Sequence, residues 1–444
     1  MSHMKSLSVR QSAGRFVEKC FLLEHQNLHL AYFPKSHQVL SLNQAAIPII
    51  TALNGVGFTP RTSADQKFIN SLSTAGLLTS EPVPDSPDIQ QSTDYRPTRV
   101  GLLLTDVCNL YCVYCYSHNN KTPQTMSETV ACAAIDLIIK NASEDHSVAH
   151  LQFHGGGEPT CAWSMVQTTI EYFESKVKLE GVEKYIGITT NGVFSQQRLA
   201  WLAEHVDEFC ISWDGTKEIH DRLRPKRNGQ GSYDDVLRTF DYIDKIGKKY
   251  WISSTVTEDS LQYFPGIIDV LANRPGFEAI SLEPIYQHGR GQELDVPDAD
   301  RFLEAFRAVK KLGRDNDLRI EFSSARGGSI RKSYCYATDP AFNVTPTGMV
   351  TACYMRTDPQ DPQAGIFFHG NYDNDTGHFI FNAETRALLR SRNIDSLSEC
   401  RDCFCRYHCA GGCLNQSGAI DQVSPYRCYI TKNLTLDHLV ESLQ

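Results

Sequence analysis

The sequence predicts an α/β protein whose centre is a partly closed barrel of parallel strands, with a small module before it and a cysteine-rich region after it. Strand and helix patterns alternate along the middle of the chain, which is typical of parallel sheets. Polar motifs follow these strands at the points where they end. Eleven of the 15 cysteines fall into two groups, one directly after the first barrel strand and one near the C-terminus. These observations predict that the chemistry lies at one end of the barrel.

The barrel is predicted over residues 99–325. Apolar runs suited to buried strands alternate there with segments of helical periodicity, such as 127–142 and 233–247. About six strand–helix units in succession predict a partial, TIM-like (β/α)6 barrel whose functional groups lie at the carboxyl ends of the strands. The expected strands cover residues 99–105, 150–156, 184–191, 208–215, 250–257 and 279–286.

Residues 17–80 are predicted to form a separate module of a hairpin followed by two amphipathic helices, which resembles a winged-helix fold. The first 80 residues carry seven basic and three acidic side chains, so this module is mildly basic while the rest of the chain is acidic. Residues 81–98 are rich in Pro, Asp and Ser and are predicted to be a linker.

The composition is that of an ordinary globular protein, with 41% hydrophobic and 21% charged residues. A net charge of −9 argues against bulk nucleic-acid or anionic-membrane binding, and neither a membrane span nor a signal peptide is recognised. We therefore expect a cytoplasmic protein, in which many cysteines indicate metal or redox chemistry. The four scattered cysteines are expected to be small hydrophobic residues: Cys20, Cys132, Cys161 and Cys210.

Three cysteines at Cys-x3-Cys-x2-Cys spacing follow the first barrel strand in the stretch CNLYCVYC: Cys108, Cys112 and Cys115. A structural zinc site uses four ligands, and a disulfide framework uses an even number of cysteines. Three thiols therefore leave one coordination position of a metal centre open. The stretch resembles the cluster motif of the radical S-adenosylmethionine (SAM) enzymes. That resemblance implies a 4Fe–4S cluster on the three thiolates, with SAM on the fourth iron. The alternative is a partial zinc site with a distant fourth ligand.

Motifs at the ends of later strands continue this resemblance. HGGGEPT follows the second strand, TTNG closes the third and SWDG closes the fourth. Alone, such motifs are also typical of plain turns, and surface arginines are usually just solvated. The resemblance implies that Gly156, Gly157 and Glu158 bind the amino group of SAM, Asn191 lines its pocket, Ser212 and Asp214 hold its ribose and carboxylate region, and Tyr114 lies against its adenine. HDRLRP after the fourth strand puts Arg222 and Arg224 near the same opening, where we expect them to bind a carboxylate of SAM or of the substrate.

The second group of cysteines resembles the seven-cysteine pattern of the SPASM domain, expected over residues 331–440. A zinc ribbon would use four of these thiols and leave three unexplained. The resemblance implies two auxiliary 4Fe–4S clusters, and therefore three clusters in all. Cys405 is an extra thiol that is either the missing ligand of the first auxiliary cluster or no ligand. The implied ligands are Cys335, Cys353 and Cys413 for the first auxiliary cluster, and Cys400, Cys403, Cys409 and Cys428 for the second.

The resemblance implies an enzyme that modifies a ribosomal precursor peptide through a 5′-deoxyadenosyl radical. The N-terminal module resembles the element that binds the leader of such a peptide as an added strand. We expect an oxidative C–C or thioether cross-link, with electrons from a reductase or a flavodoxin- or ferredoxin-type donor. The alternatives are a sulfatase-type maturase that makes formylglycine, a peptide epimerase, and a metal-stabilised DNA-binding regulator.

Overall fold

The computed structural model of the chain describes residues 5–6, 16–17, 20–25, 27–53, 58, 60–79, 94–117 and 123–443. The chain divides into two compact units. We call Ser92–Ser323 together with Cys335–Ser391 the barrel unit. The terminal unit combines both ends of the chain: Met1–Gln91, Ser324–Tyr334 and Arg392–Gln444.

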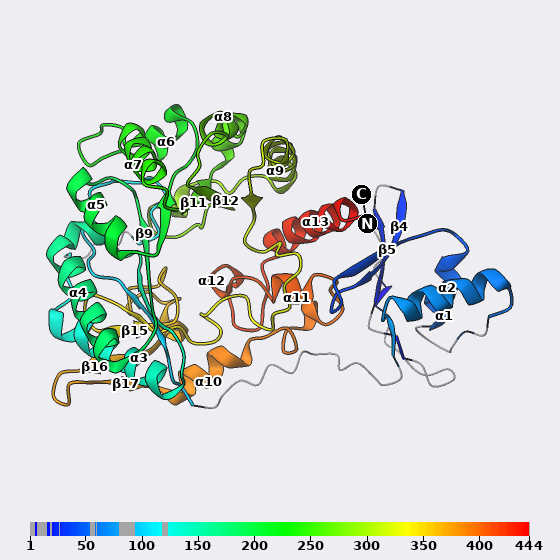
Figure 1. The fold of residues 1–444 in the computed structure, drawn as a ribbon, viewed down its shortest axis with the longest axis horizontal. Helices are drawn as coiled ribbons and strands as arrows, with labels where there is room; N and C mark the ends of the chain where they lie inside the picture. The colour runs from blue at the N-terminus through cyan, green and yellow to red at the C-terminus, as the bar shows by residue number, and fades with distance from the viewer. Residues whose placement is uncertain are drawn as a thin grey trace. The chain divides into compact units, whose positions relative to one another are not determined.

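The barrel unit is built on a parallel sheet in which consecutive strands are neighbours. All six predicted strands are present, and a short seventh strand follows them at one edge of the sheet. Helices lie along the outer side of this curved sheet (Figure 1). The predicted α/β architecture is therefore confirmed. The strands are β7 (Arg99–Leu102), β8 (Ala149–Phe153), β9 (Lys184–Thr190), β10 (Glu208–Ser212), β11 (Tyr250–Val256), β12 (Phe277–Pro284) and β13 (Ile320–Glu321).

The helices of the barrel unit bury one apolar stripe each against the sheet. In α3, for example, the fully buried side chains of Ala134, Ile135 and Ile138 recur at helical spacing. Ser127 caps this helix by accepting a hydrogen bond from the backbone N–H of Val130. The helices are α3 (Glu128–Glu144), α4 (Trp163–Glu180), α5 (Gln196–His205), α6 (Lys217–Leu223), α7 (Tyr233–Lys245), α8 (Pro265–Leu271), α9 (Ala299–Arg314) and α10 (Ala383–Ser391).

A second set of strands extends the barrel sheet beyond β7. Strand β14 pairs parallel with β7, with Asn343 opposite Gly101, and β15 to β17 continue as an antiparallel meander. Residues 335–391 thus share a sheet with the barrel, while residues from 392 onward belong to the terminal unit. The region 331–440 is divided between the two units. These strands are β14 (Asn343–Val344), β15 (Met349–Thr351), β16 (Phe368–Asp373) and β17 (His378–Phe381).

The N-terminal part of the terminal unit contains the predicted hairpin and both predicted helices. Its main sheet has the order β1-β3-β4-β5, and α1 and α2 cover one face of it. Of the linker expected over 81–98, residues 81–93 lie outside the described part of the chain. The elements are β1 (Lys5–Ser6), β2 (Phe16–Val17), β3 (Phe21–His25), β4 (Leu28–Phe33), β5 (Gln38–Leu42), α1 (Ala46–Leu53), α2 (Ser63–Thr74) and β6 (Leu78–Thr79).

The C-terminal part of the terminal unit is helical. Two one-turn helices, α11 (Arg406–Cys409) and α12 (Leu414–Ser417), carry the cysteine segment, and the longer α13 (Pro425–Glu441) ends the described chain. The buried Arg392 guanidinium organises this region by donating to the carbonyl oxygens of Ile420, Gln422 and Gly411. Over the residues described by the structure, no helix has the length and apolarity needed to cross a membrane.

Candidate active site

The three-cysteine loop leaves the carboxyl end of β7 and is held in place by a segment that follows α6. The backbone N–H groups of Tyr111 and Val113 donate to the carbonyl oxygens of Pro225 and Leu223, at 2.7 and 2.9 Å. The side chain of Arg227 donates to the carbonyl oxygen of Cys108 at 2.6 Å. This pairing fixes the backbone that carries the thiols.

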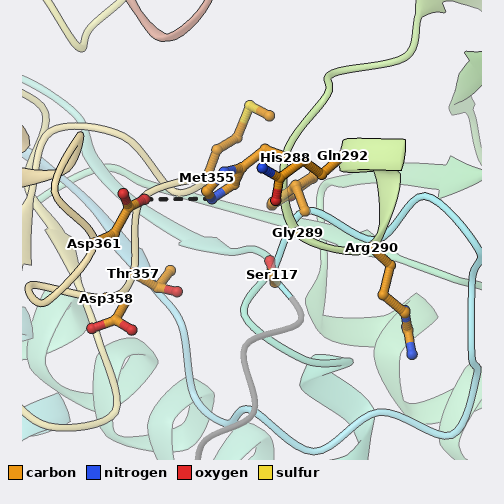
Figure 2. Close-up of a pocket in the computed structure, with 10 residues that line it drawn as sticks. Ser117, His288, Gly289, Arg290, Gln292, Met355, Thr357, Asp358 and Asp361 are labelled. Carbon is orange, nitrogen blue, oxygen red and sulfur yellow. Dashed lines mark ion pairs between the residues drawn. The ribbon is translucent and has the colours of Figure 1, made fainter. Parts of the chain in front are cut away.

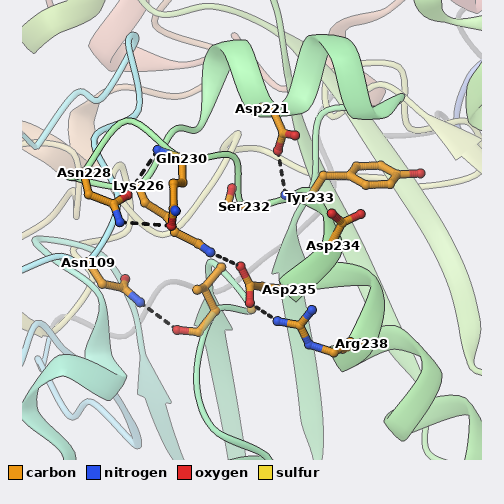
Figure 3. A network of polar contacts seen from close by, with 12 residues as sticks. Asn109, Asp221, Lys226, Asn228, Gln230, Ser232, Tyr233, Asp234, Asp235 and Arg238 are labelled. Carbon is orange, nitrogen blue, oxygen red and sulfur yellow. Dashed lines mark hydrogen bonds and ion pairs between the residues drawn. The ribbon is translucent and has the colours of Figure 1, made fainter.

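Polar side chains also hold the cysteine loop and the segment after α6 in position. Figure 3 shows Lys226 directed toward Asp235, at 2.5 Å, and Asn109 donating from the cysteine loop. The acceptor of Asn109 is the carbonyl oxygen of Val193, 2.6 Å away in the loop after β9. The cysteine loop is therefore bound to the connection after β9 and to the connection between α6 and α7.

The Gly-Gly-Gly-Glu turn after β8 lies directly against the cysteine loop. The N–H of Gly157 donates to the carbonyl oxygen of Thr105 at 2.6 Å, and that of Glu158 to Val107 at 2.9 Å. A Cβ at Gly157 would stand 2.1 Å from the Val107 carbonyl oxygen, so only glycine permits this approach. Gly156 has a φ of +85°, in the region that favours glycine. The two motifs therefore form one backbone platform.

The Glu158 carboxylate is buried and joins this platform to the end of β9. It accepts hydrogen bonds from the Thr160 and Thr190 hydroxyls at 2.8 and 2.7 Å, and from the Asn191 backbone N–H at 2.8 Å. Burial nevertheless raises the pKa of Glu158 above its usual value. The side-chain amide of Asn191 lies 3.8 Å from the Cys108 sulfur. Glu158 and Asn191 thus lie at neighbouring strand ends, with Asn191 beside the first thiol.

The thiols themselves are close enough to affect one another. Burial raises the pKa of Cys108 to about 12, with further contributions from Glu158 and from the other two thiols of the loop. Burial likewise raises the pKa of Cys112 to about 11, against the opposing effect of Arg224. Without a bound cation these two thiols are protonated at neutral pH, so a metal centre must displace protons when it binds.

A buried ion pair lies beside Cys112 at the end of β10. The Arg224 side chain donates from Nε to Asp214 at 2.9 Å, and its guanidinium lies 5.3 Å from the centroid of the Tyr114 ring. The Tyr114 hydroxyl donates to the same carboxylate, whose other oxygen accepts the Thr255 N–H at 3.0 Å. Burial opposes the charge of Arg224, but Asp214 raises the pKa of Arg224 overall.

This arrangement brings Tyr114, Asp214 and Arg224 together, and the Asp214 carboxylate accepts from three protein donors. Ser212 is half-buried at the end of β10, two residues before Asp214. Arg222 lies apart from the pair, because its side chain is exposed and contacts Asp259 at 3.4 Å. The geometry therefore assigns Asp214 first to positioning Arg224 and Tyr114.

A cavity of about 460 Å³ opens beside the last cysteine of the loop (Figure 2). The N–H of Arg290 donates to the carbonyl oxygen of Cys115 at 3.0 Å, which joins the cavity wall to the cysteine loop. The volume lies within the range of small-ligand sites, roughly 300–1,000 Å³. Its lining residues come from the cysteine loop, from the connection after β12 and from the segment after Cys353: Tyr116, Ser117, His288, Gly289, Arg290, Gln292, Met355, Thr357, Asp358 and Asp361.

A charged network closes one side of this cavity. Asp361 lies 3.6 Å from the Nε2 atom of His288 and also pairs with Arg356, which is almost completely buried. Burial and the nearby Arg356 charge lower the pKa of His288. These residues could not be predicted because they follow no motif, although β12 ends at Pro284, shortly before His288.

A neutral histidine was also missed in the sequence. His154 directly precedes the glycine turn, and its ring stacks on that of Tyr354 with centroids 3.7 Å apart. Burial lowers the pKa of His154 to about 4, and its Nδ1 atom has no hydrogen-bond partner among the residues that the structure describes. Its position directly before Gly155 was the one feature of the sequence that could have indicated a role for His154, but a lone histidine in a turn predicts none.

The C-terminal cysteines fall into both units. Cys335 and Cys353 belong to the barrel unit and Cys413 to the terminal unit. In the barrel unit Cys353 and Cys115 both raise the pKa of the half-buried Tyr116, after the larger effect of burial, so Tyr116 lies near both thiols. The structure thus brings Cys353 close to the cysteine loop within the barrel unit.

The four cysteines expected at the second auxiliary cluster lie together in the terminal unit. Burial raises the pKa of Cys400 to about 12, and Cys403 and Cys428 raise it further. Burial also raises the pKa of Cys409, as do the other three thiols. Such mutual effects require the four sulfurs to be near one another. Four thiols in one place are the donor set of an iron–sulfur cluster.

Cys405 lies among these four thiols. Its side chain is buried and hydrogen-bonds that of Cys403, which lowers the pKa of Cys403 to about 7. Across the described residues, no three His, Cys, Asp or Glu side chains are placed to hold one metal ion. A cluster differs from a single ion because each thiolate binds a different iron, so its ligands stand further apart.

Comparisons with known proteins agree with this geometry. Residues 102–269 match the Radical SAM superfamily. The chain is 26% identical over 329 residues to the mycofactocin maturase MftC of Mycolicibacterium smegmatis, covering 70% of this chain and 76% of that protein. It is 22% identical over 334 residues to the serine-type anaerobic sulfatase-maturating enzyme of Klebsiella aerogenes, covering 70% and 78%.

Two solved structures share the fold. Native anSMEcpe with bound AdoMet superposes with a TM-score of 0.62 at 18% identity, covering 77% of this chain and 98% of that one. Streptococcus suis SuiB bound to the precursor peptide SuiA gives a TM-score of 0.51 at 14% identity, covering 93% and 99%. The matched residues contain the three-cysteine loop, the glycine turn and the buried Asp214–Arg224 pair. The chain therefore contains a radical SAM domain and is a radical SAM enzyme, a class that uses a 4Fe–4S cluster and SAM.

Proposed function

We propose that this enzyme oxidatively modifies a peptide substrate and closes a C–C or thioether cross-link within it. The observation that carries the proposal is the cavity beside Cys115, which opens next to the three-cysteine loop and reaches the segment after Cys353. A peptide residue bound there would lie between two groups of thiols. The similarity to MftC, to a sulfatase-maturating enzyme and to SuiB with its precursor peptide supports a peptide or protein substrate.

The three thiols of the loop would hold the SAM-binding cluster. When bound, cluster and SAM supply a 5′-deoxyadenosyl radical that removes a hydrogen atom from the substrate. The residues around the loop position this reaction. Asn191 and Glu158 keep the glycine turn against Cys108, and Asp214 holds Arg224 and Tyr114 beside Cys112.

We propose the SAM contacts that the sequence predicts. The backbone of Gly156 and Gly157 would face the amino group of SAM, Ser212 its ribose, and the face of Tyr114 its adenine. Arg224 has only its Nε committed to Asp214 in the contacts above, which leaves its terminal nitrogens for a carboxylate. Glu158 and Asp214 would act by holding these groups in position.

The C-terminal thiols would hold two auxiliary clusters. Removal of a hydrogen atom leaves a substrate radical, and a new bond requires the loss of one further electron and one proton. A cluster held by these thiols would supply the acceptor for that electron. The proposed ligands are those expected from the sequence, with Cys335, Cys353 and Cys413 at one cluster and Cys400, Cys403, Cys409 and Cys428 at the other.

The N-terminal module would bind the leader of the precursor. In its sheet, β1 occupies the edge beside β3, whereas β5 pairs with β4 alone among the described strands. An added strand would therefore bind along β5, residues Gln38–Leu42. Re-reduction of the SAM cluster would come from a flavodoxin- or ferredoxin-type donor or a reductase.

Mass spectrometry of a precursor peptide after turnover tests this function. Any short peptide encoded beside this gene is the candidate substrate, and it is incubated anaerobically with the reconstituted enzyme, SAM and a reductant. A cross-link makes the peptide lighter by two hydrogens. A Cys or Ser converted to an aldehyde would instead support the sulfatase-type activity. An unchanged mass with altered retention would support epimerisation, in which a hydrogen atom is returned.

A further inference from the structure

The two ends of the chain share one hydrophobic core, which none of the motifs predicts. The sheet of the N-terminal module has two covered faces. One face packs on the module's own helices, with Ala31, Phe33 and Ile50 completely buried. The other face packs on the C-terminal cysteine segment. Figure 1 shows α11 and α13 next to this sheet within the terminal unit.

The contact on the second face is apolar and almost completely buried. Leu23 and Leu30 of the sheet pack with Phe404 and Leu439, and each of these side chains is at most 7% exposed. The thiol of Cys405 lies in the same cluster, completely covered. The cluster also includes two proposed cluster ligands as partly buried members, Cys403 and Cys409.

A buried hydrogen bond joins the same two segments. The hydroxyl of Tyr32 in β4 bonds to Nε2 of His408, which lies between Cys405 and Cys409. The Nδ1 atom of His408 donates to the carbonyl oxygen of Ser329 at 3.0 Å, so Nε2 is the acceptor for Tyr32. His25 of β3 lies 3.3 Å from Asp437 of α13 and adds a second polar contact. The polar contacts fix the register of the apolar face.

We propose that the N-terminal module forms a wall of the auxiliary cluster site made by Cys400, Cys403, Cys409 and Cys428, and shields that site from water. This inference rests on the ligand set proposed above. Solvent access and hydrogen bonds to the sulfurs govern the stability and potential of an iron–sulfur centre. A module that binds the peptide leader is thereby in direct contact with an electron-transfer site.

Two neighbouring leucines of β3 provide a matched test in the full-length enzyme. Leu23 points to the cysteine segment and Leu22 to the module's own core. The rate of iron release to a chelator is measured anaerobically for Leu23→Ala, Leu22→Ala and the parent. The release phase of this cluster is the one that disappears in Cys400→Ala. EPR-monitored titration gives the potential of the same cluster.

We expect Leu23→Ala to speed this phase by about tenfold or more, because a cavity at the interface favours its local opening. Tyr32→Phe, which removes only the hydrogen bond, should speed it by about fivefold. Leu22→Ala should change it by less than about twofold while the variant stays folded by circular dichroism. The potential should shift in Leu23→Ala and not in Leu22→Ala.

Equal effects of the two leucine variants, or no effect of Leu23→Ala and Tyr32→Phe, would overturn this inference. The proposed function has a separate point of failure. If Cys400→Ala removes no phase of iron release, the auxiliary cluster itself is absent. If Cys400→Ala removes a phase of iron release but Leu23→Ala leaves the rate of that phase unchanged, only the role of the module as a wall is refuted.

Discussion

Replacing Asp214 by Asn should destabilise the barrel unit strongly, although the two side chains have nearly the same shape. The Asp214 side chain is 0% exposed and its partner Arg224 is 9% exposed, so water cannot screen the charge that the substitution leaves behind. Breaking one side of a buried ion pair costs about 3–5 kcal/mol in the free energy of unfolding. The single carbonyl oxygen of Asn can accept from Thr255 but not also from Tyr114, which bonds the other carboxylate oxygen of Asp214, so we expect a loss within that range.

Asp259→Asn is the matched control, because it removes the same charge from an exposed pair. Asp259 contacts Arg222 at 3.4 Å with exposures of 72% and 48%, and such pairs contribute about 0–1 kcal/mol. Urea unfolding of the metal-free proteins, followed by fluorescence of the buried Trp213, gives both values. We expect a midpoint lower by about 1 M urea for Asp214→Asn and an almost unchanged midpoint for Asp259→Asn. Similar midpoints for both variants would refute the reasoning.

Three other predictions concern the cysteine sites. Gly157→Ala should abolish SAM cleavage and lower the iron content, because the added Cβ would collide with the Val107 carbonyl oxygen. Gly365→Ala is the control and should leave both unchanged, since no described atom lies within 4 Å of the added Cβ. Equal effects of the two variants would contradict the close approach of the glycine turn to the cysteine loop. The metal-free protein should lose stability as pH rises from 9 toward 12. The pKa values of Cys108 and Cys112 lie above the ordinary value of 9.0, at about 12 and about 11, so their contribution is complete below pH 9 and is lost through that window. Urea midpoints at pH 7.5 and pH 10 check this, and a rise with pH would contradict it. Cys405→Ser should retain iron better than Cys403→Ser, since Cys405 hydrogen-bonds a proposed ligand; loss of a whole cluster in Cys405→Ser would make Cys405 a ligand.

The barrel could be predicted because its information is local. Each strand is a short apolar run, and each motif follows the end of its own strand, so the order of units along the chain gives the order in the sheet. The same argument brings Cys108, Glu158 and Asn191 together, since neighbouring parallel strands end at one edge. The glycine turn shows why: Gly157 is needed for a backbone approach that its sequence position already indicates.

Contacts between distant segments could not be predicted. The pairing of β14 with β7 joins Asn343 to Gly101 across more than half of the chain, and no periodicity signals it. The core shared by Leu23 and Phe404 likewise depends on side chains that are ordinary apolar residues in each segment. The pairing of Asp214 with Arg224 was missed for another reason, because an Asp-Gly turn and a basic loop each have a simpler local explanation.

The most direct test of the radical SAM assignment is the effect of SAM on the reduced, anaerobically reconstituted protein. We predict a 4Fe–4S EPR signal that changes when SAM is added, because the three thiols leave one iron open, together with formation of 5′-deoxyadenosine. Replacement of Cys108, Cys112 and Cys115 by Ala should remove the SAM-responsive signal, about one third of the iron if three clusters are present, and all 5′-deoxyadenosine. Stoichiometric zinc with little iron, or 5′-deoxyadenosine formed equally by the triple variant, would contradict the account.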